Sequence, residues 1–286
     1  MTSLRSAGFF PAQSTRVGGR RGTGSRKLGA GIVVLVGLLV AGALVPALLQ
    51  IDPTAQNLAQ RLMAPSAQHP FGTDDLGRDI LIRCVAAALV DIPLALLGSI
   101  IPAMIGSALG LIAGFGGRVV DTIVMRFGDI LQSLPSYVFL IAVAFIVGPG
   151  VGAFLVAAAF ISWVIYARLI RSQVLVLREL DFVHAARLSG IGTPRVLARH
   201  VLPNAIPQVI VYLAADMVIS LTYLAGLSFL GLGVPAPTPE WGLMVKDGTL
   251  YLGSAWWMAT FPGLFIVLTG GALAFISDAL DERGRL

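Results

Sequence analysis

The chain has 286 residues, of which 56% are hydrophobic and only 12% are charged, and its mean hydropathy is +0.86. These values lie far outside the range of soluble globular proteins and indicate a chain that resides in a lipid bilayer. The formal net charge of +5 would favour a nucleic-acid partner for a soluble protein. In a membrane chain the positions of the basic residues are more informative than their sum, so no nucleic acid is expected.

A membrane-spanning helix needs about 20 mostly apolar residues, and the sequence contains six candidate runs. In chain order they are Gly29–Leu49, Ala86–Ala113, Ile130–Val147, Val151–Ala167, Ile206–Leu230 and Trp256–Ile276. The sequence therefore predicts an all-α integral membrane protein with six transmembrane helices over residues 29–286.

Residues 1–28 are rich in Arg, Gly and Ser and predict a disordered, basic cytoplasmic tail. Arg20 and Arg21 stand before an apolar run that ends in "ALVPA", which is also typical of a twin-arginine signal peptide cleaved near Ala47. That run has about 21 apolar residues, more than the 7–15 of a signal core. We therefore favour a retained first span over a cleaved signal.

The basic residues predict the orientation of the chain. With a cytoplasmic N-terminus, all of the 20 Lys and Arg residues fall on the cytoplasmic side except Arg61, Arg78, Arg83 and Lys246. This is a strong positive-inside bias, and six spans return the C-terminus to the cytoplasm. The exterior segments are then 50–85, the Gly-Pro-Gly turn at 148–150, and 231–255.

Two further segments carry position-specific signals. Residues 118–135, "RVVDTIVMRFGDILQSLP", keep helical spacing while carrying charges, which suggests a helix that enters the membrane from the cytoplasmic interface. Trp241, Trp256 and Trp257 flank the sixth span on its exterior side, where an aromatic belt is the expected arrangement.

The cytoplasmic segment from Asp181 to Gln208, "DFVHAARLSGIGTPRVLARHVLPNAIPQ", holds two short helix patterns. Asp181 caps a helix through Ser189 that Gly190 ends, and Thr193-Pro194 starts a second helix that Pro203 closes. Each would be only about 12 Å long, too short to cross a bilayer. An apolar-faced pair of this kind packs on its own membrane surface or fills a groove on a cytoplasmic partner, and periodicity alone leaves both open.

The residue order of this segment is more specific. Ala185-Ala186 is followed by Gly190 and, after nine more residues, by His200-x-Leu202-Pro203-Asn204. This pattern resembles the EAA loop of ABC importer permeases, most closely that of the dipeptide, oligopeptide and nickel branch.

The resemblance covers roughly residues 69–286. Further stretches similar to family signatures occur in the same order: "HPFGTDDLGRDIL" (His69–Leu81), Gly116-Gly117 with Asp121, Trp163 with Tyr166-Ala167-Arg168, and "LSFLGLGVPAPTPEWG" (Leu227–Gly242). The order and the exterior motif resemble the second, C-type permease of a pair.

The resemblance implies a type I ABC importer permease fold in the inner membrane of a bacterium. It also implies a homologous second permease, two cytoplasmic ATPase domains and an exterior substrate-binding protein as partners. Peptides are the first expected substrate, with nickel complexes, glutathione and haem as alternatives. No cofactor is expected in this chain, since ATP and Mg²⁺ belong to the partner ATPases and the sequence holds no GxxxxGK[ST] loop and no nucleophile elbow.

The resemblance assigns coupling to the ATPases to segment 181–204. The residues expected to take part are Phe182, His184, Ala185, Ala186, Gly190, Arg195, His200, Leu202, Pro203 and Asn204. The family usually has Glu before Ala-Ala where this chain has His184, which leaves the detailed docking contact open.

Asp91 and Asp216 are the ionisable residues deepest in the expected spans, and intramembrane charge is a functional hypothesis by default. Asp216 falls near the membrane midplane, where it either offers a carboxylate to a peptide's amino group or makes a structural hydrogen bond. Asp91 lies nearer the exterior. No metal site is expected, because three His and one Cys show no zinc spacing.

Two functions of other classes remain open. An ion-coupled secondary transporter is expected to have more paired ionisable residues at mid-membrane. An intramembrane enzyme needs converging catalytic groups, which Asp91 and Asp216 alone do not supply.

Overall fold

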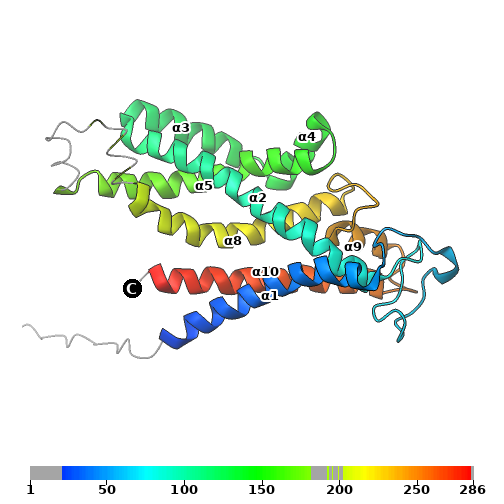
Figure 1. The fold of residues 1–286 in the computed structure, drawn as a ribbon. Coiled ribbons are helices and arrows are strands. Elements are labelled where there is room, and N and C mark those ends of the chain that lie inside the picture. The colour runs from blue at the N-terminus through cyan, green and yellow to red at the C-terminus, as the bar shows by residue number, and fades with distance from the viewer. Residues whose placement is uncertain (1–20, 182–191, 193–194, 196–198, 200–201, 285–286) are drawn as a thin grey trace, which may run out of the picture.

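The computed structural model describes residues 21–181, 192, 195, 199 and 202–284. Over this part of the chain the fold is all helical (Figure 1), apart from one isolated β-bridge between Thr73 and Asp79. The elements are α1 (Arg21–Leu49), the 3-10 turn η1 (Leu58–Gln60), α2 (Ile80–Phe115), α3 (Gly117–Gln132), α4 (Ser136–Val147), α5 (Val151–Leu177), α8 (Leu202–Phe229), α9 (Trp241–Thr249) and α10 (Trp257–Gly284).

Five of the six expected spans are confirmed as single helices. The helices α1, α2, α5, α8 and α10 are each long and apolar enough to cross a membrane. The expected span Ile130–Val147 is wrong as a single helix, because α3 and α4 meet at a bend of 91°. With 12 residues, α4 is about 18 Å long, too short for a hydrocarbon core of about 30 Å. The two helices cross together, as one broken span, or form a re-entrant loop.

Pro135 explains the break. Its backbone is extended, with φ −58° and ψ 129°, and it directly precedes α4. Proline has no N–H to donate back into α3, and its ring disfavours helical backbone at the residue before it. The helix α3 therefore ends at Gln132 and a new helix starts at Ser136 in another direction.

Helix boundaries differ from the expected ones at three places. The helix α1 begins at Arg21, so residues 21–28, assigned to the tail, form its first turns. The helix α2 begins at Ile80, six residues before the expected span start at Ala86, and the Asp79 carboxylate accepts a hydrogen bond from the Ile82 N–H (3.0 Å). The helix α8 begins at Leu202 and includes Pro203 in its first turn. The expected span from Ile206 is therefore helical from at least Leu202 onwards.

The helices α2 and α5 pack tightly along their C-terminal halves, through three glycines spaced four residues apart. A Cβ at Gly106 would lie 2.2 Å from the Trp163 carbonyl oxygen, and one at Gly110 would lie 2.5 Å from that of Ala167. At Gly114 the obstacle is a Val174 side-chain carbon at 2.5 Å. Small residues at such spacing let two membrane helices approach through their backbones. This contact fixes the C-terminal half of α5 against α2.

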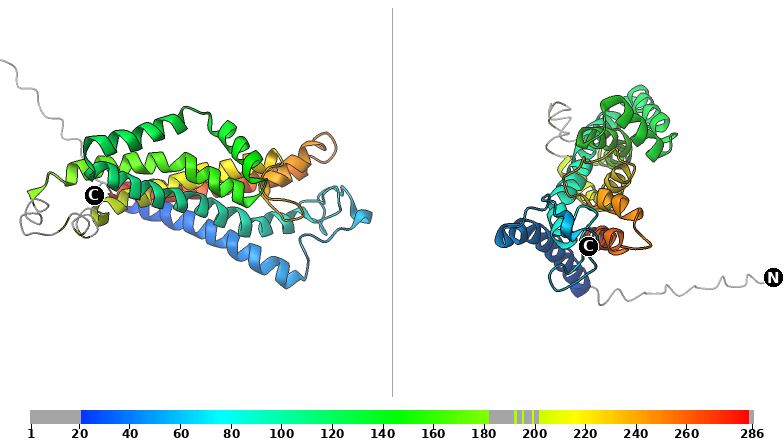
Figure 2. Two further views of the ribbon diagram at one scale, coloured as in Figure 1. Left: turned by 90° about the horizontal axis from the view of Figure 1, so that it is seen from above. Right: turned by 90° about the vertical axis from the view of Figure 1, so that its right-hand side faces the viewer.

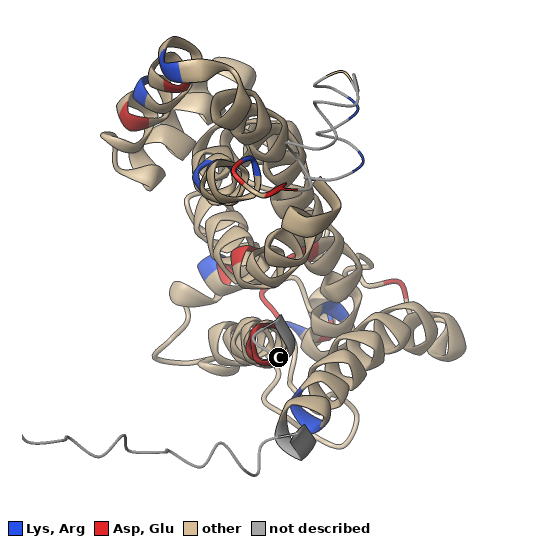
Figure 3. Cartoon of the chain, turned by 90° about the vertical axis from the view of Figure 1, so that its left-hand side faces the viewer, with Lys and Arg blue, Asp and Glu red and all other residues tan. Residues whose placement is uncertain are grey.

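The helix α1 runs beside α10 and the start of α2 (Figures 1 and 2) and is otherwise open to its surroundings, with only 11% of its apolar window buried. The start of α1, the end of α5, the start of α8 and the end of α10 lie at one end of the bundle, while residues 50–79 and α9 lie at the other. Figure 3 looks onto the first end and shows how few positions of the bundle are charged. That this end faces the cytoplasm stays a prediction of the charge distribution.

Candidate functional site

The expected coupling residues fall into two groups. Phe182, His184, Ala185, Ala186, Gly190 and His200 lie outside the described residues, so their proposed role stays a prediction. Leu202, Pro203 and Asn204 form the first turn of α8. Arg195 is exposed, and its backbone N–H donates to the Gly192 carbonyl (3.0 Å).

Ion pairs join α3 to α5 near the point where the chain leaves the bundle. Arg171 holds the Asp121 carboxylate with two donors, its Nη2 lying 2.6 Å from Oδ2. Arg168 donates to Asp129 (2.8 Å), a closer partner for this carboxylate than Arg126 at 3.9 Å. The bidentate pair is the stronger one, because a guanidinium fork matches a carboxylate. These contacts tie α3 to the C-terminal part of α5.

Asp216 lies halfway along α8. It is 14 residues after Leu202 (216 − 202), which is about 21 Å along the helix, and it is 1% exposed. The Tyr166 hydroxyl on α5 donates to its Oδ2 (3.0 Å). Ser99 on α2 and Ser162 on α5 also lie within hydrogen-bonding reach of this carboxylate. The expected structural hydrogen bond is therefore present, and its donor is Tyr166.

Asp216 also borders a cavity of about 250 Å³ at the bend between α3 and α4. Its lining comes from four helices and the bend: Leu131, Gln132, Leu134, Ser136, Phe139, Ile161, Ser162, Ile165, Asp216, Ile219 and Tyr223. The Tyr223 ring packs edge-on against Tyr137, at 5.7 Å between centroids. The bend between α3 and α4 thus borders a partly polar space that α5 and α8 also line.

Asp91, the second intramembrane carboxyl group, belongs to a different place. It is fully buried in α2, and its Oδ2 accepts from the Trp241 backbone N–H (3.1 Å) at the start of α9. Its neighbour is Glu240, also fully buried, which caps α9 by accepting from the N–H groups of Gly242 (2.9 Å) and Leu243 (2.6 Å). Asp91 therefore fastens the exterior helix α9 to α2, and it does not line the cavity at Asp216.

One shared proton accounts for this carboxyl pair. Asp91 and Glu240 are neighbouring buried carboxyl groups whose charges act on each other, and Asp91 Oδ1 has no hydrogen-bond partner within the described residues. Burial raises the pKa of Glu240, although the N–H groups of Leu243 and Gly242 oppose the shift. Two buried carboxylates in contact cannot both be ionised. Both Glu240 oxygens accept backbone N–H groups of α9, and these two hydrogen bonds stabilise the ionised form of Glu240.

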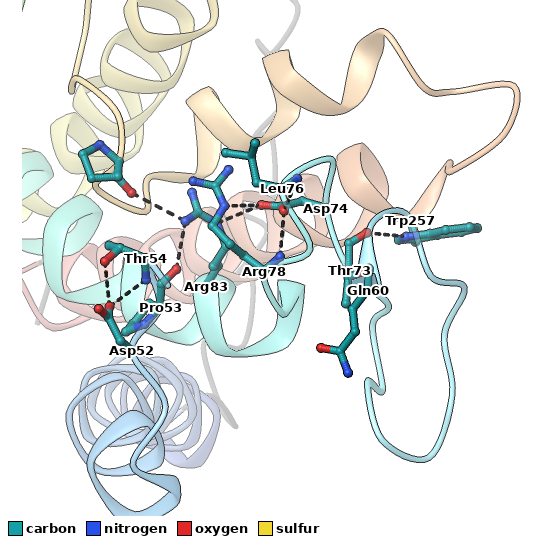
Figure 4. Close-up of polar contacts among 11 residues, drawn as sticks. Asp52, Pro53, Thr54, Gln60, Thr73, Asp74, Leu76, Arg78, Arg83 and Trp257 are labelled. Atoms are coloured by element: carbon teal, nitrogen blue, oxygen red, sulfur yellow. Dashed lines mark hydrogen bonds and ion pairs between the residues drawn. The ribbon is translucent and has the colours of Figure 1, made fainter. Parts of the chain in front are cut away.

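A polar network that the sequence did not reveal organises the exterior end (Figure 4). Arg83 is only 2% exposed and donates through Nη1 to the carbonyls of Pro53 (2.9 Å) and Pro237 (3.5 Å). Its Nε lies 3.6 Å from Asp74, whose carboxylate accepts a closer bond from Arg78 (2.6 Å). Arg83 therefore joins the loop after α1, the motif before α2 and the loop before α9.

Two of the three exterior tryptophans belong to this network and not to an aromatic belt. Trp241 is fully buried and donates from its indole to the Cys84 carbonyl (2.9 Å), while Trp257 donates to the Thr73 carbonyl (3.1 Å). Trp256 is 51% exposed and is the one that remains available to a belt. The expected belt is thus wrong for Trp241 and Trp257.

Metal-ligating residues do not gather anywhere in the described ranges. No group of three or more His, Cys, Asp or Glu side chains there is placed to hold an ion. His69 instead bonds through Nδ1 to Asp79 (2.8 Å), the residue that caps α2.

Comparison with known proteins gives matches over most of the chain. Residues 106–285 match the model of the family described as binding-protein-dependent transport system inner membrane component. The probable D,D-dipeptide transport system permease protein DdpC of Escherichia coli is 35% identical over 286 residues, covering 99% of this chain and 96% of that protein. The dipeptide transport system permease proteins DppC of Alkalihalophilus pseudofirmus (36% identical; 88% and 83% covered) and of Bacillus subtilis (35%; 88% and 79%) are similar too.

A solved structure shares the fold. A chain of the MetNI methionine ABC transporter, in an inward-facing conformation, superposes with a TM-score of 0.55 at 19% identity. The match covers 71% of this chain and 95% of that one. The likeness shows that this chain shares its helical fold with that chain.

Proposed function

The chain belongs to the family of inner-membrane components of binding-protein-dependent transport systems, and from this premise we propose that it is the C-type permease of an ABC importer for dipeptides or oligopeptides. It is a multi-pass protein of a bacterial inner membrane. Its own family role is translocation and not catalysis.

The observation that carries this proposal is the end-to-end match with a dipeptide-system permease. The alignment with the E. coli relative covers 99% of this chain and 96% of that one, so it includes the exterior segment and α1 as well as the helices that match the family model. The relatives from three bacterial genera are named for dipeptide systems. This favours peptides over nickel complexes, glutathione or haem.

In the proposed assembly this chain pairs with a homologous permease, two cytoplasmic ATPase domains bind ATP and Mg²⁺, and an exterior protein delivers substrate. Closure of the ATPases pushes on segment 181–204, and the helices move as rigid bodies between inward-open and outward-open states. Two features of the described residues support this transmission. The glycine contact of α2 with α5 is too tight to slide freely, and ion pairs tie α3 to the cytoplasmic end of α5.

Within the segment, small side chains at Ala185, Ala186 and Gly190 permit close docking, with Phe182 and His184 beside them. Arg195, His200, Leu202, Pro203 and Asn204 complete the proposed coupling set. Leu202–Asn204 are already part of α8, so a push on the segment is delivered directly to the helix that carries Asp216.

The ion-coupled transporter is the weaker alternative. Its mid-membrane relay would need paired ionisable groups, whereas Asp216 is held by Tyr166 and Asp91 by Glu240 and α9. Asp216 lines the cavity at the α3–α4 bend, and Asp91 is not part of that lining.

The proposal is tested by purifying the tagged full chain from its host in mild detergent and measuring ATP-dependent uptake of a labelled dipeptide by membrane vesicles. We expect an ATPase and a second permease to copurify. Gly190→Arg should remove the ATPase, because a long charged side chain prevents close docking. Ala67→Arg adds the same charge at an exposed site at the opposite end of the bundle and should leave ATPase recovery unchanged.

Copurification of the ATPase with Gly190→Arg at the wild-type level would contradict the assigned coupling segment. Dipeptide uptake that continues without ATP would contradict the importer itself.

A further inference from the structure

The carboxylate of Asp216 has hydroxyl partners but no cationic one. Tyr166 donates to it, and Ser99 and Ser162 lie within reach. Among the ion pairs of the described residues, none includes Asp216. A buried carboxylate at mid-membrane is costly to maintain, and hydrogen bonds from neutral hydroxyls compensate only part of that cost. A cation that arrives from outside the chain would complete the site.

The cavity beside Asp216 has the chemistry to receive one. Its wall includes Tyr223 and Phe139, whose aromatic faces attract cations, while Gln132 and Ser136 at the α3–α4 bend offer hydrogen bonds to amide groups. Its volume of about 250 Å³ is just below the roughly 300–1,000 Å³ of small-ligand pockets. That space suits one end of a peptide and not a whole oligopeptide.

We propose that Asp216, with the cavity at the α3–α4 bend, is a subsite for the amino-terminal ammonium group of a peptide as it crosses the membrane. This inference rests on the proposed function, since it needs a substrate with a free amino group. Asp216 pairs with the ammonium, the Tyr223 ring screens it from lipid, and Gln132 accepts or donates to the first peptide bond. The subsite selects for a free amino terminus after the exterior protein has already released the peptide.

A purely structural role for Asp216 leads to a different expectation. If its carboxylate served only to join α8 to α5 through Tyr166, its loss would slow transport of every substrate equally. A substrate subsite instead distinguishes peptides by their amino terminus. The comparison of two peptides therefore separates the two roles.

The test uses the complete importer in proteoliposomes with dialanine and N-acetyl-dialanine, each saturating the binding protein as checked by titration of that protein alone. Asp216→Asn should lower maximal dialanine uptake at least about tenfold, which is the loss expected for a desolvated charge pair. Uptake of the acetylated peptide should change by less than about twofold, and Asp216→Glu should restore part of the preference. Asp278→Asn, on an exposed part of α10, is the matched control and should transport both peptides normally.

A second readout does not depend on the binding protein. Dicyclohexylcarbodiimide, an apolar reagent for membrane carboxyl groups, should label Asp216 in the purified importer, and millimolar dialanine should slow this labelling while N-acetyl-dialanine does not. Equal losses for both peptides in Asp216→Asn, no loss at all, or equal protection by both would each overturn the subsite. If the wild-type importer takes up no peptide, it is the proposed function that fails.

Discussion

Replacing Arg83 by Ala tests how the exterior end of the bundle is held together. Arg83 stands in the first turn of α2 and is 2% exposed, yet its partners lie 30 and 154 residues away, at Pro53 and Pro237. No other described side chain bonds to both of these loops. The substitution should therefore loosen the segment between α1 and α2 together with the loop before α9.

The magnitude follows from the individual contacts. A hydrogen bond from a charged donor, such as that to Pro53 at 2.9 Å, contributes about 1.5–3 kcal/mol. The two buried methylenes beyond Cβ contribute about 0.8 kcal/mol each, and the 3.5 Å contact to Pro237 adds little. Asp74 stays paired with Arg78 at 2.6 Å, so no charge is left buried alone. The expected loss is about 3–5 kcal/mol.

The assay is the thermal midpoint of the detergent-solubilised chain, followed by size-exclusion chromatography with fluorescence detection. A loss of this size should lower the midpoint by roughly 6–20 °C, at about 2–4 °C per kcal/mol for chains of similar size. Limited proteolysis should cut first within residues 50–79. Arg61→Ala is the matched control, because Arg61 is exposed and makes a single bond of 3.3 Å to Tyr251.

A midpoint within about 2 °C of wild type for Arg83→Ala, with an unchanged cleavage pattern, would refute the reasoning. So would a loss of similar size for Arg61→Ala, since that would mean that any exterior arginine has this effect. The thermal midpoint of Arg83→Lys should fall between those of the wild type and Arg83→Ala, because a lysine retains the charge and the methylene chain but lacks the guanidinium fork.

Three other substitutions test contacts inside the bundle. Asp91→Asn should lower the free energy of unfolding by less than about 1 kcal/mol in thermal-midpoint measurements, because an amide can both donate to Glu240 and accept from the Trp241 N–H. Asp91→Ala should lower it by about 1–3 kcal/mol, because it leaves the buried Trp241 N–H unpaired. Equal losses for the two variants would contradict the shared proton. Gly106→Ala should lower the free energy of unfolding by about 1–3 kcal/mol, because the added Cβ overpacks against α5. Gly37→Ala, whose added Cβ meets nothing within 4 Å, should leave the thermal midpoint unchanged in the same assay. Arg171→Lys should lower the free energy of unfolding by about 1 kcal/mol and should lower coupled ATPase activity, because it replaces a two-donor contact with Asp121 by a single donor. ATPase activity at the wild-type level would argue against a role of the α3–α5 ion pair in coupling.

The spans were predictable because hydropathy acts over whole helices. Twenty or more apolar residues have no other stable state in lipid than a helix, so α1, α2, α5, α8 and α10 follow from composition alone. The boundaries were less predictable, since capping acts over single residues. Asp79 was readable as a helix cap, but Pro203 fits equally after one helix or at the start of the next.

The polar contacts were not predictable, because each joins residues far apart in the sequence. The depth of Asp216 follows from counting residues, but its partner Tyr166 is 50 residues away. Trp241 has the position of a belt residue, and only its bond to Cys84, 157 residues distant, shows that it is buried. Arg83 was counted among exterior charges for the same reason. Local pattern fixes the helix on which a side chain lies, while the packing of helices fixes what it meets.

The break between α3 and α4 depends both on the local sequence pattern and on the packing of the helices. Residues 130–147 are apolar enough for a span, and the same residues include a proline whose extended backbone ends one helix and directs the next. In lipid, a non-helical stretch must satisfy its backbone groups within the protein. Here the Leu134 N–H donates to the Leu131 carbonyl and the Phe139 N–H donates to the Pro135 carbonyl. The bend also borders the cavity whose lining includes the polar side chains of Asp216 and Ser162. Irregular backbone at membrane depth is tolerated where it lines a polar space, so the break and the buried carboxylate are two parts of one site.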